Sequence, residues 1–260
     1  MEEVTTRHLN EPAVLVEVQR TEGSAPREVG AWMLVTGGAV QGTIGGGQLE
    51  FQAIAQARRL LAGEAGEAVQ RHALGPSLGQ CCGGVVHLGL RLLQPGEVSL
   101  PAGPRAPVAL FGGGHVGRAL VRGLGELPFE VLWVDSRDEI FPAQVPANVR
   151  CEHSDPVQAA VAYLPAQCRV LIMSFSHAED LDVVAACLKR QRERADLPFI
   201  GLIGSKSKWG AFRHRLEARS FTAGELAHVT CPIGVPGVAG KQPEVIAVAV
   251  AAQLLQLPFP

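Results

Sequence analysis

Short apolar runs alternate with helical patterns along the second half of the chain. Most of these runs are four or five residues long, as buried strands are, and amphipathic patterns separate them. Regular alternation of this kind is typical of a parallel sheet with helices on both faces. The predicted strands are 108–111, 131–134, 149–151, 169–173 and 199–203, and the predicted helices end near Leu127, Tyr163, Arg194, Arg219 and Leu255.

The first half of the chain has a different pattern. Strand-like runs at 13–18, 31–35, 39–44, 67–74 and 85–93 accompany a single helical pattern that follows Gly47. Residues 94–107 are rich in proline and glycine and show no periodicity, so they are predicted to be a linker. We therefore predict a smaller N-terminal α+β domain over 1–100. A Rossmann-like, doubly wound α/β domain of the nucleotide-binding type is predicted over 107–260.

A glycine-rich turn lies between the first strand and the first helix of the second half. Gly112, Gly113, Gly114, His115 and Gly117 fit the pattern G-x-G-x-x-G, and Asp135 ends the next strand, 135 − 112 = 23 residues later. Glycines at these places let a phosphate approach the free N–H groups at a helix start, and the acid is placed to bind a ribose hydroxyl. This arrangement predicts a dinucleotide-type site. The alternative is a tight turn that no longer has a ligand.

Polar residues follow three further strands of the predicted parallel sheet. Asp135 favours a free ribose 2′-hydroxyl, whereas Arg137 leaves a 2′-phosphate possible. Alternatively, Arg137 pairs with Asp138 or Glu139. His177 follows the strand at 169–173. Ser205 and Lys208 open the helix after 199–203, where their hydroxyl and ammonium donors would suit a phosphate. Since the carboxyl ends of parallel strands face the ligand crevice, these side chains are candidate ligand contacts. The alternatives are a histidine that faces water and an ordinary capped helix.

The first half contains two more candidate features. Gly45, Gly46 and Gly47 form a second glycine-rich turn before a helix, which is either another anion site or a plain turn. Cys81 and Cys82 are adjacent in a glycine-rich loop. A thiol in such a loop ionises and binds a soft metal, or else it is a small buried side chain, and the residues alone favour neither.

Composition excludes several classes of protein. The chain has 260 residues, 47% of them hydrophobic, and a net charge of −2 without a basic run, which argues against nucleic acid as a partner. Its longest nearly apolar stretch, 245–255, is too short for a bilayer, which needs about 20 residues. The six cysteines form no C-x-x-C pair, and the first residues have no secretory pattern. We expect a cytoplasmic protein with reduced thiols.

Taken together, the motifs resemble the XdhC/CoxI family of xanthine dehydrogenase accessory proteins. The resemblance covers both halves and depends on the order and spacing of the motifs. They are Gly23-Ser24-Ala25-Pro26-Arg27; Gly42 to Gly47 with Leu49-Glu50; Leu78 to Gly84 with Cys81-Cys82; Gly112 to Gly117 with Asp135 and Arg137; Ile200 to Ser205 with Lys208; and Pro232-Ile233-Gly234 with Pro243-Glu244.

The resemblance implies a chaperone for the molybdenum cofactor (molybdopterin) rather than an enzyme. Such proteins hold the cofactor while a cysteine desulfurase supplies its terminal sulfur, pass it to apo xanthine dehydrogenase or a related molybdoenzyme, and look like homodimers. The family often has Thr-His where this chain has Ser176-His177, and an acid where it has Gln253.

The expected cofactor contacts combine the motifs with this resemblance. Phosphate is assigned to the Gly45–Gly47 turn, a phosphate or nucleotide such as NAD(P) to the Gly112–Gly117 turn, and molybdenum to Cys82 or its neighbour. The full set is Gly45, Gly46, Gly47, Cys81, Cys82, Gly112, Gly113, Gly114, His115, Gly117, Asp135, Arg137, His177, Ser205 and Lys208.

Two other hypotheses remain. An NAD(P)-dependent oxidoreductase would use the same glycine turn, but the chain has no Tyr-x-x-x-Lys pattern and no zinc set, and only His177 is placed as a proton donor. The other is a binding module that senses a nucleotide with its second half and docks a partner with its first.

Overall fold

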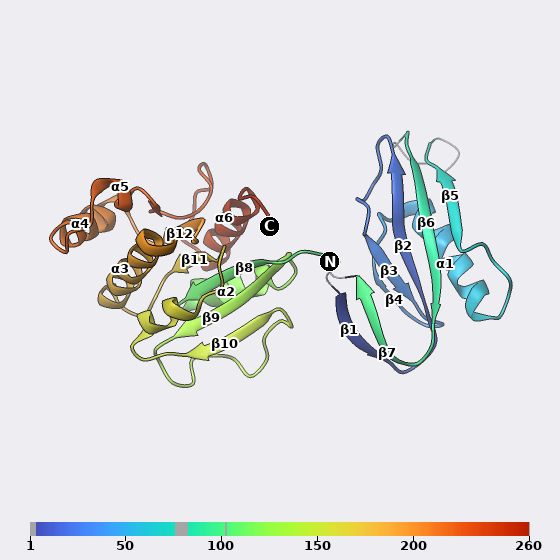
Figure 1. Cartoon of the computed structure of the whole chain (residues 1–260), viewed down its shortest axis with the longest axis horizontal. Coiled ribbons are helices and arrows are strands. Elements are labelled where there is room, and N and C mark those ends of the chain that lie inside the picture. The colour runs from blue at the N-terminus through green and yellow to red at the C-terminus, as the bar shows by residue number, and fades with distance from the viewer. Residues whose placement is uncertain (1–3, 76–82, 102, 260) are drawn as a thin grey trace. The chain divides into compact units, whose positions relative to one another are not determined.

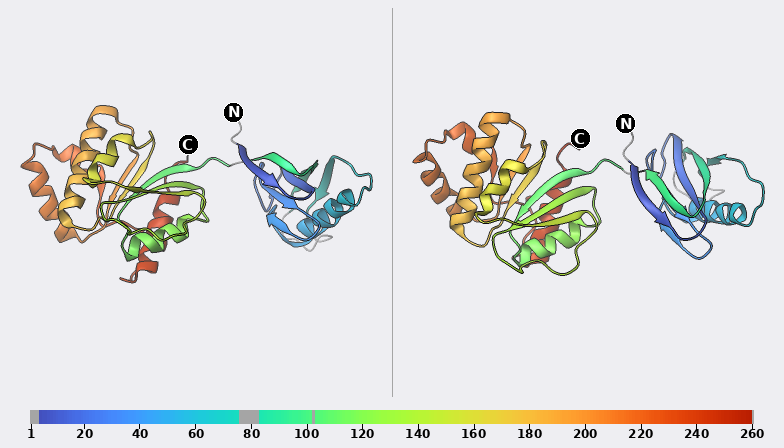
Figure 2. Two further views of the ribbon diagram at one scale, coloured as in Figure 1. Left: turned by 90° about the horizontal axis from the view of Figure 1, so that it is seen from below. Right: turned by 60° about the horizontal axis from the view of Figure 1, so that its bottom comes forward.

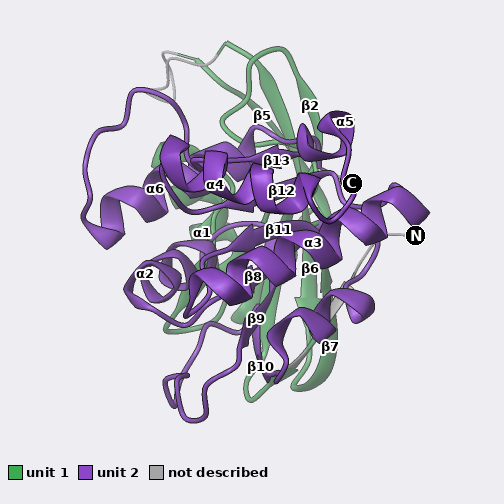
Figure 3. Ribbon diagram, turned by 90° about the vertical axis from the view of Figure 1, so that its left-hand side faces the viewer, with its two compact units in different colours: residues 1–103 green, residues 104–260 purple. Residues whose placement is uncertain are grey.

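The computed structural model describes residues 4–75, 83–101 and 103–259. The chain divides into two compact units, residues 1–103 and 104–260, which are coloured separately in Figure 3. Within the described residues, unit 1 has two sheets and two cores, and unit 2 has one sheet with a core on each face.

Unit 1 is an antiparallel sheet with one helix. Its strand order is β4-β3-β2-β6-β5, and α1 lies beside it (Figure 1). Side chains alternate along β2, so that Val14, Val16 and Val18 share a core with α1, while Leu15 belongs to the core on the other face. The bounds are β2 Ala13–Glu22, β3 Trp32–Val35, β4 Val40–Gly42, α1 Gly47–Leu61, β5 Val69–Ala73 and β6 Val85–Leu93.

A two-stranded sheet corrects the predicted linker. β7 (Gly96–Pro101) pairs antiparallel with β1 (Val4–Leu9), a strand that the sequence pattern did not reveal. Val98 and Leu100 pack into the second core of unit 1, whereas Glu97 and Ser99 are exposed. Residues 94–107 therefore do contain a strand with alternating buried and exposed side chains, but the surrounding glycines and prolines concealed it. Its partner, β1, lies at the other end of the unit.

Unit 2 is a six-stranded parallel sheet; the sequence predicts the parallel arrangement and all of its strands except β13. Its order is β10-β9-β8-β11-β12-β13, the 3-2-1-4-5-6 order of dinucleotide-binding folds. The bounds are β8 Ala106–Phe111, α2 His115–Leu124, β9 Phe129–Asp135, β10 Val149–His153, the 3-10 helix Val157–Tyr163, β11 Arg169–Ile172, α3 His177–Arg194, β12 Phe199–Leu202, α4 Lys206–Glu217, α5 Ala223–Leu226, β13 Val229–Thr230 and α6 Pro243–Leu255.

Helices cover both faces of this sheet. α2 and α6 pack together in one core with Val108 and Leu110, while α3 and the 3-10 helix share the other core with Ala109 and Phe111 (Figures 1 and 2). Consecutive residues of β8 thus enter opposite cores, which explains why this strand is apolar throughout. None of the helices in the described part of the chain combines the length and apolar character that a membrane crossing requires.

Candidate functional site

The strand order reverses between β8 and β11, and the glycine turn begins at this point. Ligands of open parallel sheets bind in the crevice outside the strand ends at such a reversal. Gly112 has φ +123°, and a Cβ there would lie 2.0 Å from the carbonyl oxygen of Met173, directly after β11. Only glycine therefore fits where the turn passes the end of the neighbouring strand.

The other glycines of the turn face different surroundings. A Cβ on Gly117 would lie 2.1 Å from the oxygen of Gly112, so α2 packs directly against the turn. The indole N–H of buried Trp133 donates to that same oxygen over 3.0 Å and fixes it from β9. A Cβ on Gly114, by contrast, would meet nothing within 4 Å. The turn is therefore close-packed at Gly112 and Gly117 and open at Gly114.

The start of α2 retains unused hydrogen-bond donors. Within the described residues, the N–H groups of Gly114, His115 and Val116 have no acceptor, and the His115 side chain is exposed. Unpaired donors and the positive end of the helix dipole both favour an anion at this place. The geometry suits a phosphate group, as the sequence pattern predicts, and its binding remains a prediction.

Asp135 lies underneath this turn and is bound to its own chain. Its side chain is 1% exposed; one carboxylate oxygen accepts from the N–H of Gly113 over 2.5 Å and from Arg137 Nη2 over 2.8 Å. The other oxygen accepts from Nε and from the backbone N–H of Arg137, each over 2.9 Å. Burial alone would raise the pKa of Asp135, but these donors outweigh it and lower that pKa.

Arg137 therefore pairs with Asp135, which was not among the partners weighed from the sequence. Its guanidinium also lies 4.5 Å from the ring centre of Phe175, an exposed residue of the loop between β11 and α3. Glu179 holds that loop by accepting from the Ser136 hydroxyl over 2.6 Å and from the Phe175 N–H over 3.1 Å. The contacts made by Phe175 and Glu179 link the ends of β9 and β11, and sequence reasoning missed both of them.

Lys208 is likewise engaged within the chain. Its ammonium donates to Asp180 over 2.6 Å and to the carbonyl of Ile203 over 2.9 Å, and both charged side chains are nearly buried. Ser205 caps α4 by accepting from the Lys208 N–H. His177 begins α3, is exposed and lies edge-on to the ring of Phe212. The predicted phosphate role of Lys208 would compete with its bond to Asp180.

The glycine turn of unit 1 is occupied by a side chain. A carboxylate oxygen of Glu50 accepts from the Thr43 hydroxyl over 2.5 Å and from the N–H groups of Ile44 and Gly46, each over 3.1 Å. A phosphate at this turn would have to replace that carboxylate. Glu50 lies in the first turn of α1, and an acid at that place is the sequence signal for such a contact.

The predicted thiol site lies outside the described residues, since both Cys81 and Cys82 fall within 76–82. Four other cysteines are free: Cys168 and Cys187 are buried, and Cys151 and Cys231 are partly buried. Across residues 4–75, 83–101 and 103–259, no three His, Cys, Asp or Glu side chains form a group that could hold a metal ion.

Comparison with known proteins identifies both halves of the chain. Residues 108–254 match the model of the XdhC Rossmann domain, and residues 7–72 match the model of the XdhC and CoxI family. The uncharacterized protein YqeB of Escherichia coli K12 is 23% identical over 254 residues, which make up 95% of this chain and 44% of YqeB. The chain therefore spans less than half the length of this curated relative.

A solved structure has the same fold. It is a protein described as a xanthine dehydrogenase from Bacillus halodurans, with a TM-score of 0.72 and 18% sequence identity. The match covers 95% of this chain and 91% of that one. The likeness extends over both units and concerns the fold.

Proposed function

Because the chain belongs to the XdhC and CoxI family, we propose that it is an accessory protein for the maturation of xanthine dehydrogenase or a related molybdoenzyme. In this proposal it binds the molybdenum cofactor as cargo and holds it while a cysteine desulfurase supplies the terminal sulfur. It then delivers the cofactor to the apo enzyme. The family match supports the accessory role.

The observation that carries the proposal is the open start of α2. Molybdopterin ends in a phosphate, and the three unpaired N–H groups from Gly114 to Val116 form a place for one. This turn lies at the β8/β11 reversal, where open parallel sheets bind their ligands, and this position supports the proposal. A nucleotide attached to the cofactor, or NAD(P), would use the same donors.

The metal end of the cargo is assigned to the Cys81-Cys82 loop on sequence grounds. Thiolates are soft ligands and suit a molybdenum–sulfur centre. We also propose that the protein is cytoplasmic and acts as a homodimer. Light scattering of the purified chain would test the homodimer.

The decisive experiment measures binding of the isolated molybdenum cofactor to the wild type and to a matched pair of variants. Gly114→Asp places a carboxylate beside the unpaired donors, and the open space around Gly114 predicts an intact fold. Asp is also a favourable helix N-cap. Gly123→Asp adds the same charge at an equally open position near the other end of α2. Cys81→Ala and Cys82→Ala test the metal end.

We expect stoichiometric binding by the wild type and by Gly123→Asp, and at least tenfold weaker binding by Gly114→Asp. The loaded wild type should also activate apo xanthine dehydrogenase. If the wild type binds no cofactor but binds and oxidises NADPH with a substrate, the protein is an oxidoreductase and the proposal fails.

A further inference from the structure

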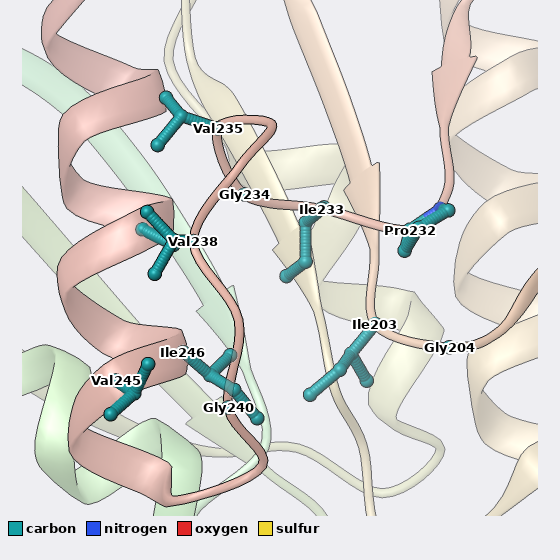
Figure 4. A pocket seen from close by; sticks show the side chains of 11 residues that line it. Ile203, Gly204, Pro232, Ile233, Gly234, Val235, Val238, Gly240, Val245 and Ile246 are labelled. Atoms are coloured by element: carbon teal, nitrogen blue, oxygen red, sulfur yellow. The ribbon is translucent and has the colours of Figure 1, made fainter.

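A cavity of about 220 Å³ opens beside the candidate site, at the same edge of the sheet. It lies entirely within unit 2, between the ends of β12 and β13, the loop that follows β13, and the start of α6 (Figure 4). Its lining comprises Ile203, Gly204, Pro232, Ile233, Gly234, Val235, Val238, Gly240, Val245, Ile246 and Ala249, and we call it the ring cavity.

Aliphatic side chains form two opposite walls of the ring cavity. Ile203 and Ile233 lie on one side, and Val245 and Ile246 of α6 lie on the other (Figure 4). Part of the loop wall carries no side chain, because Gly240 has φ +150° and a Cβ there would lie 2.8 Å from Val245 Cγ1, while Val235 and Val238 of the same loop also line the cavity. Apolar walls with exposed backbone between them suit a flat ring rather than a bulky aliphatic group.

The polar groups around the ring cavity belong to the backbone. The Gly234 N–H donates to Gln253 Oε1 over 2.7 Å and the Val235 N–H donates to the Ala249 oxygen over 3.1 Å, which fixes the loop on α6. In the described part of the chain, the N–H groups of Val238 and Gly240 have no acceptor. The lining contains no charged side chain. A neutral ring with carbonyl or ring-nitrogen acceptors on its edge matches this chemistry.

The ring cavity is too small for a whole ligand, since pockets for complete small molecules measure about 300–1,000 Å³. It is well placed for one end of a longer ligand. β12 is separated from β8 only by β11, so two strand spacings of about 4.8 Å, or about 10 Å in all, lie between the two strand ends. α2, which follows β8, also packs beside α6, whose first turns line the ring cavity.

We infer that the ring cavity binds the ring of a flat nitrogen heterocycle whose phosphate lies at the start of α2. This inference rests on the proposed function and deepens it, because it assigns the ring end of the cargo to named residues. The pterin of the molybdenum cofactor and the nicotinamide of a dinucleotide share this chemistry, so the test includes both sources.

The test uses a pair of tryptophan substitutions on α6. Val245→Trp fills the ring cavity, whereas Val248→Trp lies three residues further along the same helix, outside the lining and 67% exposed. Val238→Trp fills the cavity from the loop, where the side chain is 48% exposed, and decides the test if Val245→Trp does not fold. Thermal unfolding followed by circular dichroism establishes that each variant is folded.

Binding of two probes, the isolated molybdenum cofactor and NADPH, is measured on the full chain. For the probe that the wild type binds, we expect at least tenfold weaker binding by Val245→Trp and Val238→Trp, and a change below twofold for Val248→Trp. Equal binding of the molybdenum cofactor by all variants overturns this inference but leaves the proposed function intact.

A different result would overturn the proposed function but keep the ring cavity. If the wild type binds only NADPH and the two cavity variants lose it, the proposed function fails and the ring cavity remains, with nicotinamide as its ring. If the wild type binds neither probe, both fail.

Discussion

Replacing Asp135 by Asn tests whether this residue holds the glycine turn. In the structure all four hydrogen bonds to its carboxylate come from the chain itself: one from Gly113 and three from Arg137. Asn has nearly the same shape, but its NH₂ group donates. Each carboxylate oxygen accepts two of these hydrogen bonds. In either orientation of the amide, its NH₂ group replaces one oxygen, so two N–H donors of the chain lose their acceptor.

The magnitude follows from these lost bonds. A hydrogen bond to a charged group contributes about 1.5–3 kcal/mol. We use the lower value because the Arg137 side chain is 31% exposed and water replaces part of its lost interaction. Two lost bonds then lower the free energy of unfolding by about 3 kcal/mol at pH 7. Glu130→Gln, at an exposed position on the same strand, should change it by less than about 0.5 kcal/mol.

The assay is urea unfolding followed by the fluorescence of Trp133, in a background in which Trp32 and Trp209 are Phe. The pKa of Asp135 is lower in the folded state than in the unfolded state, where it is about 4. Its contribution to the free energy of unfolding is therefore fully present above pH about 4 and is lost as the pH falls through the pKa of the folded state. The difference in free energy of unfolding between Asp135→Asn and its parent should therefore be smaller at pH 3 than at pH 7. A loss below 1 kcal/mol at pH 7, or an equal loss at both pH values, would refute the reasoning.

Three further predictions concern unit 2. Gly112→Ala should lower the free energy of unfolding by about 3 kcal/mol or more because of its positive φ and the collision with Met173, while Gly114→Ala should change it by less than about 1 kcal/mol in the same urea titration. Asp180→Asn leaves the Lys208 ammonium without its charged partner and should cost about 3–5 kcal/mol, and adding Lys208→Met should recover part of that loss in a double-mutant cycle. Burial raises the pKa of Cys168 to about 12 and raises that of Cys187 as well, so iodoacetamide at pH 8 followed by mass spectrometry should label these two thiols only after unfolding.

The apolar pattern predicted those strands of unit 2 whose two faces are both buried. β8, β11 and β12 stand between helices on either side; β8 and β12 are apolar throughout, and β11 is apolar after its first residue, Arg169. β13 has only two residues and was missed, because two residues make no pattern. β1 was missed for another reason. Its four central residues, Thr5 to His8, are all polar and give no apolar signal, and its pairing with β7 joins the two ends of unit 1.

The candidate site was predictable as a set of glycines but not as a set of free donors. Spacing placed Gly112, Gly117 and Asp135 correctly around one turn, because strand, turn and helix are local in sequence. It did not reveal that Asp180 lies against Lys208, since 28 residues separate the two and only the folded sheet brings them together. Donor and acceptor balance is a property of the tertiary structure, and short patterns do not contain it.

The places where the sequence predicts an anion differ in whether their donors are unpaired or already bound to a carboxylate. At the unit 1 turn a phosphate must displace Glu50, and at Lys208 it must compete with Asp180. At the start of α2 it meets unpaired N–H groups and displaces no side chain among the described residues. Expelling a bound carboxylate costs the hydrogen bonds it made, so the phosphate of any ligand should bind first at α2. Glu50→Gln should then leave phosphate affinity almost unchanged while Gly114→Asp removes most of it, and the reverse result would move the principal anion site to unit 1.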